Sequence, residues 1–128
     1  MSFEEVEFLK RRAEAFLRNA KRLIEEGEWD LAIFSLEQYC QLMLKYKLLV
    51  RTGSYPRTRS LRRLIRELGK KSKELLVLVE DEKSLLYITK LEDAYIASRY
   101  LPRIYEEREV RDTYRFIIKV FKDAVEKA

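Results

Sequence analysis

The sequence predicts an all-α protein, an antiparallel up-and-down bundle of four or five helices. Only three Gly and two Pro occur in 128 residues, although these residues normally punctuate the many turns of an all-β fold. Charged residues make up 38% and hydrophobic residues 47%, a balance typical of long helices with exposed ion pairs. Apolar residues also recur at helical spacing along most of the chain. Because this length suits one hydrophobic core, we expect a single domain over residues 1–128.

The first predicted helix begins after Ser2 and ends near Gly27. Ser2 and Glu5 have the spacing of a capping box, in which a hydroxyl and a carboxylate satisfy free backbone N–H groups. Glycine is a typical residue just past the end of a helix. Between these two signals the apolar residues keep helical spacing, at Val6, Leu9, Ala13, Phe16, Leu17, Ala20, Leu23 and Ile24.

A second helix, opened by Asp30, is predicted over residues 31–50, and its apolar residues form two stripes. One stripe contains Ala32, Leu36, Tyr39, Met43, Tyr46 and Val50, and the other includes Leu31, Phe34, Leu42 and Leu49. A helix that is apolar around much of its girth is either central in its bundle or shared with another subunit. The sequence leaves both explanations open.

Residues 52–56, Thr-Gly-Ser-Tyr-Pro, are the clearest loop in the chain. A third helix is predicted from about Arg57 to Leu68, with Gly69 as its cap. Its expected buried face consists of Leu61, Leu64, Ile65 and Leu68. The following segment, 70–79, contains Leu-Leu-Val-Leu-Val, but a lone strand would have no partner to pair with. We therefore expect helix or irregular chain there.

Two further helices complete the prediction. One covers residues 82–100 and stops at Pro102, because the residue before a proline is pushed away from helical angles. Its apolar side is formed by Leu85, Ile88, Leu91, Ala94, Tyr95 and Ser98. The last helix is expected over about residues 106–127, with a stripe of Val110, Tyr114, Ile117, Phe121 and Val125 that Thr113, Val120 and Ala124 widen.

The absence of histidine removes more chemistry than any other single feature of the composition. It excludes His general bases, His metal ligands and Ser-His or Cys-His nucleophiles. Cys40 is the one cysteine, so neither an internal disulfide nor a zinc site of the usual type can be built. We expect no catalytic residue, no metal and no cofactor. The lone cysteine, together with the lack of a long apolar run, favours a cytoplasmic protein with no membrane partner.

The positive charge is concentrated between positions 51 and 73. Nine basic residues and one acid, Glu67, give this basic stretch a net charge of +8, whereas the whole chain carries +5. On a helix the three-and-four spacing of Arg59, Arg62, Arg63 and Arg66 would gather them on one face. Guanidinium groups match the geometry of phosphate, so this face is a candidate phosphate or nucleic-acid surface. The alternative is a solvated face that pairs with acids from neighbouring elements or from a second chain.

Aromatic residues lie near these arginines in the sequence. Tyr55 precedes the basic face, and Tyr95 is followed one turn later by Arg99. Tyrosine rings beside arginines can stack on nucleic-acid bases, although tyrosine at helical spacing is more often part of a core. The candidate nucleotide- or phosphate-binding residues are Tyr55, Arg57, Arg59, Arg62, Arg63, Tyr95 and Arg99.

The order of several short motifs resembles the HEPN family of small helical domains. Trp29, Ala32, Phe34 and Gln38 follow Gly27 as in the family's Gly-x-aromatic-x-x-Ala-x-Phe-x-x-Gln run, with Lys45 later in the same helix. Residues 56 and 58–61 stand where the family often reads Pro and then Thr-His-(Asp or Ser)-Leu. Residues 95–102 look like its Tyr-x-x-(Ser/Thr)-Arg-Tyr-Pro element, with Leu101 inserted before the proline. The resemblance extends over nearly the whole chain.

The resemblance implies a bundle of four or five helices, a homodimer, and association with a minimal nucleotidyltransferase in a two-component, often toxin and antitoxin, system. Many family members are ribonucleases that use an Arg followed a few residues later by His. Here Arg59 stands in place of the common His of the third helix, and no other histidine can complete that motif.

The sequence favours a noncatalytic binding module that presents its basic face to a nucleotide, to RNA phosphate or to a partner subunit. A second hypothesis is an assembly protein whose second and last helices mediate homodimer or partner contacts only. A third is a residual ribonuclease that uses Arg99 with Tyr100 or Tyr105, but tyrosine is a poor general base at neutral pH.

Overall fold

The computed structural model describes residues 2–100 and 104–128, with side chains described for 2–97 and 104–128. Helices dominate, and these residues contain no strand, so the predicted all-α class is confirmed. In chain order the elements are α1 (Phe3–Glu25), α2 (Trp29–Thr52), α3 (Leu61–Gly69), the 3₁₀ turn η1 (Lys73–Leu76), α4 (Val77–Glu80), α5 (Glu82–Tyr100), α6 (Glu107–Phe116), the π-helical turn η2 (Ile117–Phe121) and α7 (Lys122–Lys127).

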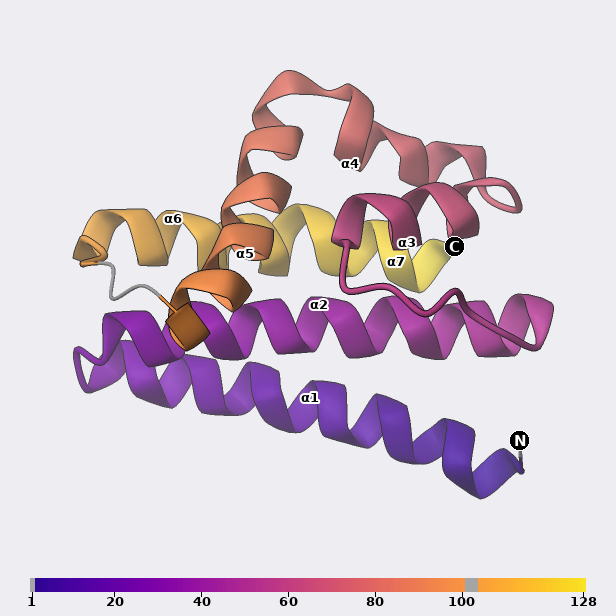
Figure 1. Ribbon diagram of the computed structural model, residues 1–128, viewed down its shortest axis with the longest axis horizontal. Helices are drawn as coiled ribbons and strands as arrows, with labels where there is room; N and C mark the ends of the chain where they lie inside the picture. The colour runs from indigo at the N-terminus through magenta and orange to yellow at the C-terminus, as the bar shows by residue number, and fades with distance from the viewer. Residues whose placement is uncertain (1, 101–103) are drawn as a thin grey trace.

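The first two helices form an antiparallel hairpin that runs the length of the molecule (Figure 1). As predicted, the hydroxyl of Ser2 accepts the backbone N–H of Glu5 and caps α1. Gly27 adopts a left-handed φ of 74°, which favours glycine, and the chain turns there into α2. Up-and-down packing therefore holds for this pair, whereas α5 crosses α2 instead of running along it (Figure 1).

Helix α2 is the central helix of the fold. It contacts α1, α3, α5, α6 and α7, and its side chains are buried around most of the girth. Among its apolar residues only Leu31 and Val50, at its two ends, are largely exposed. The double apolar stripe is thus explained by burial within this chain. The helix ends where Gly53 takes a left-handed φ of 87° and donates its N–H to the carbonyl of Leu49.

Helix α3 begins four residues later than the spacing predicted. Ser60 has extended backbone angles, and its hydroxyl accepts the N–H of Arg63, so it is the N-cap. The predicted buried face, Leu61, Leu64, Ile65 and Leu68, is confirmed. Gly69 is still helical and lacks a left-handed φ. Its role is close packing, because a Cβ there would collide with the side chain of Leu76.

The C-terminal half of the chain follows the predicted helices except at residues 117–121, where a π-helical turn interrupts the α-helical spacing. Residues 73–80 form the 3₁₀ turn and α4, as expected for a segment that has no strand partner. Helix α5 has the predicted bounds, although the expected stop at Pro102 lies outside the described residues. The last predicted helix contains a π-helical turn, and Val120, expected to widen the apolar stripe, is exposed. A π turn holds one extra residue and so rotates the following residues around the axis.

In the part of the chain that the structure describes, every helix is too short or too polar to cross a bilayer.

Candidate functional site

Arg59 lies at the end of the loop that joins α2 to α3, a loop that runs back along α2 (Figure 1). Its guanidinium carbon is 4.0 Å from the centre of the Tyr95 ring on α5, and its side chain is 47% exposed. The Tyr95 ring in turn stacks on Phe34 of α2, with 6.4 Å between ring centres. The structure therefore brings two predicted site residues, Arg59 and Tyr95, into a cation–π stack in which the arginine side chain is about half exposed.

A fully buried carboxylate lies beside this stack. Glu37 Oε1 is 4.0 Å from a terminal nitrogen of Arg59 and accepts a 2.7 Å hydrogen bond from Gln38. Glu37 Oε2 has no hydrogen-bond partner. Burial raises the pKa of Glu37 from 4.5 to about 7, although hydrogen bonds from Gln38 and Gln41 and the charges of Arg59 and Lys45 oppose the change.

The sequence prediction missed Glu37 because it assigned the glutamine of the family pattern to Gln38. Counted strictly, that pattern places its glutamine three residues after Phe34, which is position 37. The available signal was an acid at this position on a helix that is apolar around much of its girth. The burial of Glu37 depends on the tertiary packing of segments that are distant in the sequence, and the spacing of apolar residues does not reveal that packing.

Gln41 fixes the loop above Glu37. Its side-chain amide donates to the backbone carbonyl of Arg59, and because that carbonyl only accepts, the orientation of the amide is determined. Gln41 Oε1 is therefore turned elsewhere and has no hydrogen-bond partner, although it is buried.

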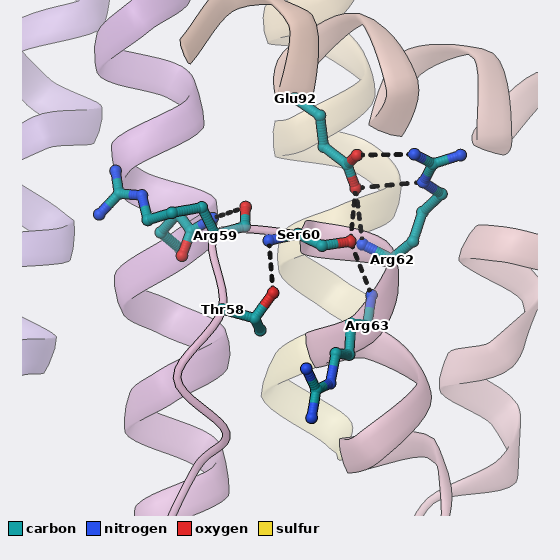
Figure 2. Close-up of polar contacts among 7 residues, drawn as sticks. Thr58, Arg59, Ser60, Arg62, Arg63 and Glu92 are labelled. Carbon is teal, nitrogen blue, oxygen red and sulfur yellow. Dashed lines mark hydrogen bonds and ion pairs between the residues drawn. The ribbon is translucent and has the colours of Figure 1, made fainter. Parts of the chain in front are cut away.

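Arg62 forms an ion pair with Glu92 that holds two helices together (Figure 2). Its guanidinium binds both carboxylate oxygens of Glu92 on α5, at 3.3 and 3.0 Å. The same carboxylate accepts the backbone N–H of Arg62 at 2.8 Å and the hydroxyl of Ser60 at 3.3 Å. Glu92 therefore caps α3 and ties it to α5. Among the predicted binding arginines whose side chains the structure describes, Arg62 has its charge most completely satisfied within the fold.

Arg63 points away from Glu92 (Figure 2). Together with Tyr55, Lys70 and Lys71 it lines a pocket of about 430 Å³ between the loop and the C-terminal end of α3. Lys70 is paired with Glu67 at 3.1 Å. The ring of Tyr55 lies 5.3 Å from the ammonium of Lys45, which also acts on Glu37. Lys45 thus lies against the Tyr55 ring of this pocket and also interacts electrostatically with Glu37 and Arg59.

The remaining predicted residues are arranged differently. Arg57 is exposed in the loop, and the side chain of Arg99 lies outside the described residues. At the start of the basic stretch Arg51 donates to the backbone carbonyl of Ala128, which caps the end of α7. Within the described residues, several exposed cations of the stretch have no acid at ion-pair distance, namely Arg57, Arg63, Arg66, Lys71 and Lys73.

This arrangement is suited to binding anions. Its guanidinium and ammonium groups provide donors for phosphate oxygens, and Tyr55 and Tyr95 offer aromatic surfaces beside them. In the described part of the chain no three acidic or cysteine side chains gather closely enough to hold a metal ion. Glu37, whose pKa lies near neutrality, is fully buried and so does not reach the surface.

Of three comparisons with known proteins, one finds a match, and it concerns the family. A family model described as the HEPN domain matches residues 6–128, which is nearly the whole chain. No curated protein and no solved structure matches. With the match covering all the described helices except the first residues of α1, this chain belongs to the HEPN domain family.

Proposed function

We propose that this HEPN domain is a noncatalytic module that binds single-stranded RNA or nucleotides through their phosphates. The observation that carries the proposal is the surface around Tyr55, where Arg63 and Lys71 line a pocket and have no acid at ion-pair distance in the described chain. Unpaired cations beside an aromatic ring match a phosphodiester chain whose bases are free to stack. Arg59 on Tyr95 provides a second position of the same kind.

The absence of histidine supports binding without cleavage. Arg59 stands where the family resemblance expects a histidine, and an arginine remains protonated throughout the physiological pH range. Glu37 titrates near neutral pH, but its burial keeps it from contacting a ligand at the surface. The described residues of the site therefore have charge for holding a phosphate, and they include no imidazole and no unpaired exposed carboxylate that would move its protons.

Fluorescence anisotropy with a short labelled single-stranded RNA tests the proposal. The double variant Arg63→Ala and Lys71→Ala is expected to weaken binding at low salt by about tenfold, since each charge contact contributes about 0.5–1 kcal/mol. The matched control is Arg11→Ala and Lys21→Ala, which removes two exposed charges from α1 and leaves the pocket intact. Equal affinities of the two double variants, or no binding by the unmodified protein, would refute the proposal.

Assembly with another subunit is the second candidate function. A groove of about 530 Å³ lies between the α4–α5 region and the last helix, lined in part by Val77, Tyr87, Phe116 and Val120. Val77 and Val120 are exposed, unlike most apolar residues of the fold. We propose this groove as the contact for a second copy of the chain, or for the nucleotidyltransferase subunit that the family resemblance implies.

Light scattering of the purified chain separates the two forms of this candidate. A dimer that dissociates in the variant Val77→Ser and Val120→Ser identifies the groove as the homodimer contact. Co-purification of a second subunit that this variant loses identifies a partner contact instead. A strict monomer that purifies alone would exclude both.

A further inference from the structure

Two buried oxygens beside Arg59 lack hydrogen-bond donors. They are Glu37 Oε2 and Gln41 Oε1, which lie one turn apart on α2. The amide of Gln41 acts on Glu37 as a hydrogen-bond donor and so lowers its pKa, but the effect of burial is larger. A buried acceptor without a donor costs about 1–3 kcal/mol, so two at one place need a physical explanation.

A proton on Glu37 removes one of these two unsatisfied acceptors. When Glu37 Oε2 carries a proton, that oxygen becomes a donor and no longer needs one, whereas an ionised carboxylate leaves a charged oxygen buried without a donor. The other oxygen of the carboxyl continues to accept from Gln38. The burial of Glu37 and the missing donor on Oε2 thus favour a neutral side chain over an ionised one.

The charges around Glu37 come from few elements. The loop contributes Arg59, whose nearest terminal nitrogen is 4.0 Å from the carboxylate, and α2 contributes Lys45 and the buried thiol of Cys40. Helix α5 contributes the Tyr95 ring against Arg59. An ionised Glu37 therefore offsets the positive charge of Arg59, whereas a neutral Glu37 leaves it for an incoming anion.

We propose that Glu37 couples ligand binding to a proton, so that a phosphodiester bound at Arg59 is held more tightly when Glu37 is protonated. This inference rests on the proposed function and adds that the protonation of Glu37 makes RNA affinity depend on pH. The phosphate adds a negative charge near the carboxyl, which favours the protonated form further, so binding takes up a proton. Glu37 acts through Arg59 and is a positioning residue without contact to the ligand.

The test is the pH dependence of RNA affinity between about pH 6 and about pH 8, with RNA that has hydroxyl ends so that no ligand phosphate titrates. The protein contains no histidine, which removes the side chain that ordinarily titrates in this range. We expect affinity to fall by up to about tenfold as the pH rises, the change that accompanies a difference of one pKa unit between the free and bound states. Glu37→Gln should bind as tightly as the acid form at every pH, with no slope.

A second measurement needs only the unmodified protein. Calorimetry near neutral pH in two buffers of different ionisation enthalpy gives the number of protons taken up when RNA binds, and we expect net uptake. If RNA binds with a flat pH profile and without proton uptake, or if Glu37→Gln keeps the slope of the unmodified protein, the coupling is wrong and the proposed function stands. If RNA does not bind at any pH, the coupling and the proposed function both fail.

Discussion

Two arginines three positions apart, Arg59 and Arg62, face different acids with opposite consequences. Arg62 meets Glu92 in a two-point contact that also caps α3. Arg59 lies 4.0 Å from Glu37, too far for a hydrogen bond, and rests on Tyr95. The first arginine supports the fold, whereas the second keeps a charge that is available to a ligand. Whether an arginine can bind a ligand therefore depends on the acids that it contacts in the fold, and the number of arginines in a segment does not show this.

The largest expected effect is the loss of the Glu92 contact. Glu92→Ala removes the acceptor for the backbone of α3 and for the Arg62 guanidinium, and we expect the free energy of unfolding to fall by about 3 kcal/mol. Urea denaturation followed by circular dichroism measures this change. Glu67→Ala, which removes a surface pair with Lys70, is the control and should cost at most about 0.5 kcal/mol. Similar losses in the two variants would contradict the anchoring role of Glu92.

Glu37→Gln is expected to have the next largest effect, with the opposite sign. Because the pKa of Glu37 is raised from 4.5 to about 7, the folded state binds more protons than the unfolded state between these values. The unmodified protein therefore loses stability as the pH rises through this window, and the loss is complete above it. Each pKa unit corresponds to about 1.4 kcal/mol, so the variant should be more stable by up to about 3 kcal/mol above neutrality.

The same variant provides its own control at low pH. Below about pH 4.5 both folded and unfolded states carry a protonated Glu37, so the stabilities should converge there. Urea denaturation at several pH values gives the difference between the two proteins, which cancels the titration of the other carboxylates. A constant difference across the pH range would mean that Glu37 titrates normally.

A smaller effect is expected when each arginine is shortened in turn. Arg59→Ala should weaken RNA binding by about fivefold to tenfold, because it removes a cation from the stack on Tyr95. Arg62→Ala should change RNA affinity less than about twofold, provided that the variant is folded, since its charge is already used by Glu92. Anisotropy titrations at one salt concentration measure both. If Arg62→Ala weakens binding more, the comparison between the two arginines is reversed.

The smallest effect concerns salt. Removing Arg63 and Lys71 should reduce the slope of log affinity against log salt by about 1.4, since a single strand releases about 0.7 counterions for each neutralised phosphate. Titrations over a range of salt concentrations give this slope. An unchanged slope would indicate that the pocket around Tyr55 does not contact the RNA backbone.

Much of the fold was readable from local signals. Ser2 with Glu5 marked the start of α1, and Gly27 marked its end, because caps and left-handed glycines act over a few residues. The start of α3 was predicted four residues early because apolar spacing does not show that Ser60 caps the helix. The π turn within the last helix was missed for a similar reason, since an extra residue leaves no mark on composition.

By itself the sequence determined the helical class, the concentration of charge between positions 51 and 73, and the absence of histidine chemistry. These properties depend on residue types and short spacings. Only the tertiary structure decided which arginines keep a free charge, because Glu92 reaches Arg62 across 30 positions and Tyr95 reaches Arg59 from the same helix α5. It also decided that Glu37 is buried beside Arg59, since burial raises a carboxyl pKa only where distant segments together exclude water.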